Sequence, residues 1–166
     1  QGGFFFTDGR DPKPVFRPKP TFDEALPPAN ATAAEALYLL GQVFSEPAYT
    51  DAAINTLRWA RAPMERYPAN HCALLNSVET ASAKSKVVVL RGPEDQVVDW
   101  LSELRSGYKP WLKCFAVPFD TTTTPRFLPA LVSTQTRSKV TAMIVEDGIV
   151  GPAFDKLTDL TAALEF

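Results

Sequence analysis

The sequence predicts an α+β fold, in which a helical N-terminal half precedes a small C-terminal lobe of strands and helices. Between residues 30 and 81, apolar residues recur every three or four positions, which is typical of amphipathic helices. The pattern changes near residue 84, and Val-Val-Val-Leu at 87–90 has the β-branched composition of a buried strand. Asp147-Gly148 is the strongest hairpin signal in the chain. These observations place a helical domain over 1–83 and an α/β lobe over 84–166.

An irregular, extended arm is expected over residues 1–28, which contain closely spaced prolines. Gly2-Gly3 precedes three consecutive aromatic residues, Phe4, Phe5 and Phe6, and the segment is interpreted as a short extended piece. Three adjacent aromatic residues at a terminus would be an interaction liability if they were exposed. We therefore predict that Phe4, Phe5 and Phe6 form an interface, covered by the rest of the protein or by a partner.

Three helices are predicted for the rest of the first half. Asn30 is a favourable N-cap residue for the first of them, which runs to Phe44. Its expected buried face is Ala33, Ala36, Leu37, Leu40, Val43 and Phe44. A second helix starts after Ser45 and ends near Pro63, and the short connection makes the pair an αα-hairpin. A third helix is expected over Ala69 to Ala81.

The second half is predicted to contain a βαβ unit, a β-hairpin and a terminal helix. Thr80 to Ser85, at the boundary, contains neither proline nor glycine and would make a poor flexible linker, so we expect the two halves to pack as one unit. The expected elements are a strand over Lys86 to Leu90, a helix from Pro93 to near Gly107, a strand over Leu112 to Val117, a strand over Lys139 to Glu146, a short strand at Ile149-Val150 and a helix over Leu157 to Leu164.

Composition and charge argue against several classes of protein. The 166 residues carry a net charge of −2 and no long basic run, which is not the pattern of a nucleic-acid-binding protein. The longest apolar runs fall far short of the roughly 20 residues that a membrane-spanning helix needs. Cys72 and Cys114 lack CxxC or zinc-type spacing, so we interpret them as two buried thiols in a reducing compartment. No metal or cofactor is predicted.

Four polar residues near the first helix are the candidates for a binding site. Arg17 and Lys19 offer cations that would clamp an anionic ligand alongside Asp23, and the simpler interpretation is that they tie the arm to its own fold by ion pairs. Asp23 with Glu24 is a poor glycosidase pair, because adjacent residues do not usually face one another. His71 and Cys72 are also adjacent, so they diverge by about 100° on a helix and make a poor catalytic pair. We therefore predict no catalytic residue.

The order of these parts resembles the C-terminal region of the spermatogenesis-associated protein 20 family. Those proteins join a thioredoxin-like domain to an α/α toroid related to six-hairpin glycosidases and sugar epimerases. The matching segments are Gly2-Gly3-Phe4-Phe5, Arg17-Pro18-Lys19-Pro20 with Asp23, Leu26-Pro27 to Asn30, Tyr49 with Ala53 and Leu57, Lys86 to Leu90, and Thr141-Ala142. The resemblance implies that the helical half is part of such a toroid, with Arg17, Lys19, Asp23 and Asn30 near a substrate.

Departures from the family pattern shape the predicted function. Phe6 stands where the family has an acidic residue after its Gly-Gly-aromatic-aromatic run, and Val145 and Val150 stand at about the places of its paired cysteines. These losses favour a non-catalytic structural or interaction subunit, or a C-terminal segment, derived from the family. The alternative is a fragment of a carbohydrate-active enzyme in which Arg17, Asp23 and Asn30 bind the substrate.

The expected partners are the remainder of a longer parent chain or the subunits of a larger complex. Gln1 opens the sequence without an initiator methionine or a signal-like segment, and we expect the chain to be part of something longer. The expected location is an intracellular, reducing compartment, with the mitochondrion or another organelle as an option.

Overall fold

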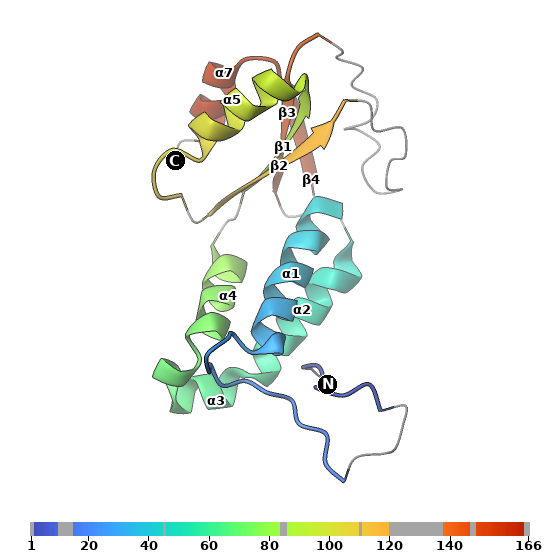
Figure 1. Cartoon of the computed structure of the whole chain (residues 1–166), viewed down its shortest axis with the longest axis vertical. Coiled ribbons are helices and arrows are strands. Elements are labelled where there is room, and N and C mark those ends of the chain that lie inside the picture. Colours follow the sequence, from blue (N-terminus) through green and yellow to red (C-terminus); the bar gives the residue numbers. More distant parts are fainter. Residues whose placement is uncertain are drawn as a thin grey trace. The chain divides into compact units, whose positions relative to one another are not determined.

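A computed structural model describes residues 2–9, 15–44, 46–83, 86–109, 111–119, 138–146 and 149–164. Within these ranges the chain forms six α-helices and one four-stranded mixed sheet, with most helices in the N-terminal half, which confirms the α+β class (Figure 1). The chain divides into two compact units: the first comprises residues 1–41 and 47–83, and the second comprises 42–46 and 84–166. The sequence pattern had placed 42–46 in the helical half.

The first unit is built from four α-helices and one short 3₁₀ turn. These are α1 (Ala29–Phe44, of which the last residues belong to the second unit), α2 (Pro47–Trp59), α3 (Arg61–Arg66), η1 (Pro68–Asn70) and α4 (Cys72–Ser82). The prediction that one helix ends near Pro63 was wrong, because α2 ends at Trp59 and Pro63 lies inside α3. Pro63 is the third residue of α3, and a helix has no partner for the N–H groups of its first turn, so proline removes no hydrogen bond there.

Small side chains form much of the core of the first unit. The buried cluster comprises Ala31, Ala34, Leu57, Ala60, Met64 and Leu74. The buried face predicted for α1 was partly wrong, since Ala36 and Leu40 are exposed. The face that is buried instead carries Asn30, Ala31, Ala34 and Tyr38, because alanines let the neighbouring helices approach closely and the polar groups find partners there.

A sheet of order β2-β1-β3-β4 organises the second unit. Its elements are β1 (Lys86–Gly92), α5 (Glu94–Leu104), β2 (Leu112–Pro118), β3 (Thr141–Glu146), β4 (Ile149–Phe154) and α7 (Leu157–Leu164). The parallel pairing of β1 with β2 around α5 confirms the predicted βαβ unit. The antiparallel pairing of β3 with β4 confirms the predicted hairpin, whose Asp147-Gly148 turn lies outside the described residues.

Side chains of β1 point alternately to two faces of the sheet, as the period of a strand requires. Val88 and Leu90 pack with residues of α5 and α7, including Val97 and Leu160. Val87 and Val89 pack on the opposite face with Met143, Val145, Val43 and Phe44. Because both faces are covered, β1 is apolar throughout its middle rather than alternating, which is why the run at 87–90 was recognisable in the sequence.

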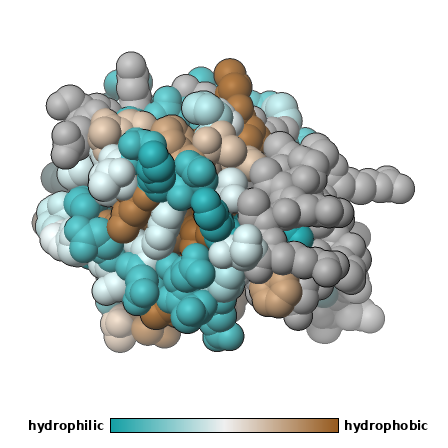
Figure 2. Space-filling view, turned by 90° about the horizontal axis from the view of Figure 1, so that it is seen from above, coloured by the Kyte–Doolittle hydropathy of each residue, from teal (hydrophilic) through white to brown (hydrophobic). Residues whose placement is uncertain are grey.

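The remaining surface of the second unit is of mixed character. Figure 2 looks onto the side of α5 and α7, where hydrophilic and hydrophobic residues are interspersed. Val98, predicted to face inward, is exposed on α5. No helix among the described residues is both long and apolar enough to cross a membrane.

Candidate functional site

The N-terminal arm lies against the first turn of α1 and the last turns of α2 (Figure 1). Two of its extended segments run beside each other, since the backbone N–H of Phe6 donates to the carbonyl of Pro18 over 2.9 Å. The ammonium group of Lys19 donates to the carbonyl of Gly2 over 2.6 Å, and Arg17 donates to Thr7. The arm is therefore held by hydrogen bonds to its own backbone, in the way that two paired strands would be.

Asn30 is the residue that joins this arm to the helices. Its side chain is fully buried and makes three hydrogen bonds to backbone groups of the arm. The Oδ1 atom accepts from the N–H of Phe4 at 2.6 Å, and Nδ2 donates to the carbonyls of Phe4 at 3.1 Å and Pro20 at 2.9 Å. The predicted N-cap role of Asn30 was wrong, because α1 begins at Ala29. The side-chain amide instead makes hydrogen bonds to the backbone of the arm, as the backbone of a paired strand would.

Gly2 and Gly3 allow the arm to touch α2 with its backbone. A Cβ atom on Gly2 would lie 1.9 Å from the carbonyl oxygen of Asn55, and one on Gly3 would lie 2.5 Å from the ring of Trp59. Gly3 also has a φ angle of 75°, a conformation that residues with side chains rarely adopt. Both glycines are thus required by the close approach of the arm to α2.

Phe4, Phe5 and Phe6, for which the sequence predicts an interface, are respectively 44%, 49% and 71% exposed. Two cations lie over the ring of Phe5: the guanidinium of Arg17 is 4.1 Å from its centroid, and the ammonium of Lys19 is 4.6 Å from it. Neither cation forms an ion pair with a residue in the described ranges. Their positive charge is stabilised by aromatic faces and carbonyl oxygens, and part of it remains accessible.

The side chain of Asp23 lies away from this cluster and contacts the first turn of α4. Its Oδ2 atom accepts from the N–H of Ala73 at 3.1 Å, and its own N–H donates to the carbonyl of Asn70 at 2.8 Å. His71, the N-cap residue of α4, makes no capping bond with its side chain, so Asp23 supplies the missing acceptor from the arm. The other carboxylate oxygen, Oδ1, is buried and has no hydrogen-bond partner among the described residues.

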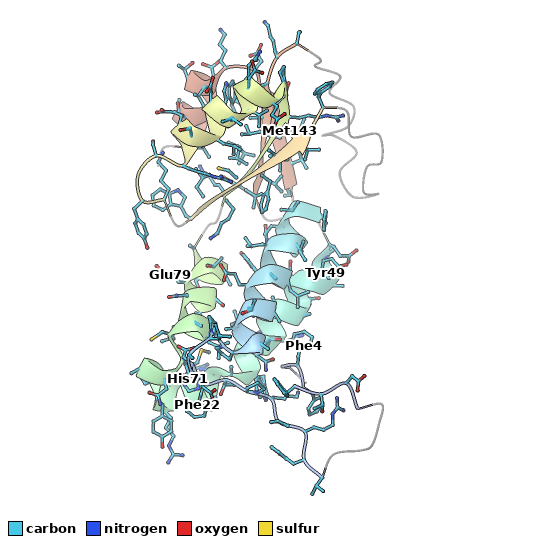
Figure 3. The ribbon with its side chains drawn as sticks, in the orientation of Figure 1. Phe4, Phe22, Tyr49, His71, Glu79 and Met143 are labelled. Atoms are coloured by element: carbon cyan, nitrogen blue, oxygen red, sulfur yellow. The ribbon has the colours of Figure 1, made fainter. Side chains whose placement is uncertain are left out.

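His71 is completely buried, and both its ring nitrogens are engaged. Its Nδ1 atom lies 2.8 Å from the carbonyl of Tyr67 and therefore carries the proton, which leaves Nε2 to accept from the hydroxyl of Thr21 at 3.2 Å. The ring of Phe22 covers the imidazole at 4.7 Å between centroids, and the two residues are adjacent in Figure 3. His71 thus anchors Thr21 and Phe22 of the arm.

The two cysteines differ in their surroundings. Cys72 is exposed at the start of α4, so the prediction of two buried thiols was wrong for it. Cys114 is partly buried on β2, and burial raises the pKa of its thiol. Among the described residues, no cluster of three or more His, Cys, Asp or Glu side chains is arranged to hold a metal ion.

The structure therefore brings Arg17, Lys19 and Asn30 together around Phe4 and Phe5, and it places Asp23 apart at α4. The sequence pattern did not identify Thr21 or the contacts of Gly2 and Gly3 with α2. Only the glycine pair offered a signal, since two glycines before aromatic residues often mark a close backbone approach.

A separate apolar groove crosses the surface between α2 and α4. It has a volume of about 560 Å³ and is lined by Ile54, Leu57, Arg58, Arg61, Met64, Glu65, Pro68, Leu75, Val78, Ala81 and Ser82. None of the four candidate binding residues lines it. A hydrogen bond to Glu65, 2.7 Å long, raises the pKa of Arg61 and holds the pair together at the rim. The groove is the second candidate site, and its chemistry is that of apolar contact.

Comparisons with protein-family models, with curated proteins and with solved structures found no match to this chain.

Proposed function

We propose that this chain is a non-catalytic interaction module, a divergent C-terminal segment derived from the spermatogenesis-associated protein 20 family. Its partners are the remainder of a longer parent chain or the subunits of a larger complex. The family assignment rests on the sequence resemblance. The interaction role rests on how the candidate side chains are used.

The observation that carries the proposal is the fate of the four candidate binding residues. Arg17 and Lys19 donate to carbonyls of the arm, and Asn30 uses its amide on the same arm. Asp23 accepts from the start of α4. Residues that bind a substrate keep polar atoms directed at it, whereas these residues direct theirs at the chain itself. These four residues therefore hold the arm in place.

The first unit also has exposed apolar surface on which a partner protein could bind. The arm presents Phe4, Phe5 and Phe6 beside two cations, and an apolar groove runs between α2 and α4. Aromatic residues and arginine are enriched at protein–protein interfaces. Exposed apolar areas of this kind mark interaction sites on soluble proteins.

The alternative, a fragment of a carbohydrate-active enzyme, needs Arg17, Asp23 and Asn30 around one substrate. Asn30 is fully buried and Asp23 serves α4, so these residues offer little to a ligand. One feature of the described residues favours the alternative: the Oδ1 atom of Asp23 is buried and has no hydrogen-bond partner among them. It is weaker than the bonding pattern of the other three residues.

Light scattering of the 166-residue chain, combined with fluorescence of a dye that binds apolar surface, tests the proposal. We expect concentration-dependent association and dye binding, both reduced by Phe6→Ser. Tyr108→Ser is the control, because Tyr108 is an aromatic residue of the second unit that is even more exposed than Phe6, and it should change neither signal. A sharp monomer peak at high concentration without dye binding would overturn the proposal.

A further inference from the structure

The walls of the groove between α2 and α4 are periodic. On α2 the lining residues are Ile54, Leu57 and Arg58, and on α4 they are Leu75, Val78, Ala81 and Ser82. The short elements α3 and η1 add Arg61, Met64, Glu65 and Pro68. Spacings of three, four and seven residues trace a stripe along a helix. The stripe on α4 spans about 10 Å, which is two helical turns, and the stripe on α2 spans about one turn.

The opposite side of α2 and α4 is closed by α1. Ala31 and Ala34 of α1 share the buried cluster with Leu57 and Leu74, and the hydroxyl of Ser77 donates to the carbonyl of Ala31 at 3.3 Å. Three longer helices and Met64 of the short α3 thus surround one core, and within the described ranges no helix occupies the position of a fourth long helix beside α2 and α4. Leu75 is 38% exposed in that position.

Charge on the groove is one-sided. Arg58 comes from α2, and Arg61 of α3 is neutralised by its ion pair with Glu65 of the same short helix. Arg58 forms no ion pair within the described part of the chain. The α4 wall contributes only uncharged residues, and its nearest acidic residue, Glu79 (labelled in Figure 3), does not line the groove. The rim beside α2 is therefore basic.

We propose that the groove binds a short amphipathic helix of a partner protein, with apolar residues facing the groove and acidic residues on the flank that meets α2. The inference rests on the proposed function, for which it specifies the partner. A helix fits because its own apolar spacing matches that of the walls. Acidic residues fit because they would pair with Arg58. A contact of two turns is small, so the complex is expected to be weak and transient.

Three synthetic, fluorescently labelled peptides test the occupant by anisotropy with the full chain. The first carries leucines at helical spacing with glutamates beside them, the second replaces the glutamates by lysines, and the third permutes the first to destroy its period. We expect the acidic helical peptide to bind at least about tenfold more tightly than either control. Added salt should reduce its advantage over the lysine peptide.

Paired variants locate the binding. Val78→Glu places a charge in the groove, whereas Asn76→Glu places the same charge on an exposed part of α4 that does not line it. Only the first should weaken binding of the acidic peptide, by about tenfold or more. Because Val78 also touches the core, Arg58→Glu is the independent test. It lies on the surface and should reverse the preference in favour of the lysine peptide, while Arg66→Glu should not.

Equal binding of the acidic and lysine peptides would overturn the inference, as would equal effects of Val78→Glu and Asn76→Glu. Stoichiometric binding of dodecanoate that displaces the acidic peptide would also overturn it, because the groove would then be a pocket for a small amphiphile. Failure of the two proposals is distinguishable. If the chain associates through Phe6 but does not bind the acidic peptide, the proposed interaction role stands and the proposed helical partner is wrong.

Discussion

The two units of the chain are stabilised in different ways. In the second unit, β1 carries Val88 and Leu90 on one face and Val87 and Val89 on the other, and both faces are covered by apolar residues of the same unit. In the first unit, alanines dominate the core, and the arm is attached by the polar side chains of Asn30, Asp23 and His71. Burial of apolar surface is non-directional, whereas hydrogen bonds require particular partners. The first unit therefore depends more on single polar residues.

The largest effect is expected from the core of the second unit. Leu90→Ala removes a fully buried side chain of β1 and should cost about 3 kcal/mol of the free energy of unfolding. Val98→Ala, on the exposed side of α5, should cost only a few tenths of that amount. Urea denaturation of both variants measures the difference. Equal costs would contradict the assignment of the sheet as the centre of this core.

Asn30→Asp should be the most damaging polar substitution in the first unit. A carboxylate loses both N–H donors, faces the carbonyls of Phe4 and Pro20, and is fully buried, so we expect a loss of about 2 to 3 kcal/mol. Burial raises the pKa of the introduced carboxyl above its unfolded value of about 4, so the variant regains stability relative to wild type as the pH falls through the raised pKa, and the gain is complete near pH 4. Asn76→Asp, on the surface of α4, is the control, and it should change the free energy of unfolding little at neutral pH and near pH 4.

Gly3→Ala tests the close approach of the arm to α2. Gly107 has the same φ angle of 75°, but nothing lies within 4 Å of a Cβ atom there, so Gly107→Ala measures the backbone strain alone. We expect about 1 kcal/mol for Gly107→Ala and about 1 to 2 kcal/mol more for Gly3→Ala, from the clash with Trp59. Thermal melts of the two variants compare them. Identical losses would show that the arm does not press on Trp59.

Asp23→Ala should give the smallest of these effects, about 1 kcal/mol, which is typical of a lost helix cap. The neighbouring Glu24 is exposed and makes no side-chain contact that the structure describes with α4, so Glu24→Ala should be nearly neutral. Hydrogen exchange of the first amides of α4 should accelerate only in the Asp23 variant. If both variants behave alike, Asp23 does not cap this helix.

Prediction from sequence succeeded where burial is repetitive and local. The run at 87–90, the spacing within 157–164 and the Asp-Gly signal each reflect contacts repeated along one element, and α7 was predicted at its observed limits. The buried face of α1 was misplaced, because Asn30 and Tyr38 are buried through bonds to residues far away in the chain. No local pattern records such a bond.

The candidate site shows the same limit. Arg17, Lys19 and Asn30 were singled out from the sequence as candidate binding residues, but it could not reveal that their partners are backbone groups of the arm, because backbone groups have no signature in a sequence. The groove between α2 and α4 escaped notice because Leu75 and Val78 read equally well as core residues. Periodicity identifies an apolar face without telling what covers it.

The most direct test of the central claim, that the first unit is the binding half, is hydrogen exchange of the full chain at low and at high concentration. The chain's uncovered apolar surfaces are expected to associate as concentration rises. The account predicts that amides gaining protection lie in residues 2–9 and 54–82, around Phe6 and the groove. Protection gained instead in 86–118 or 141–164, or no gain anywhere, would contradict it.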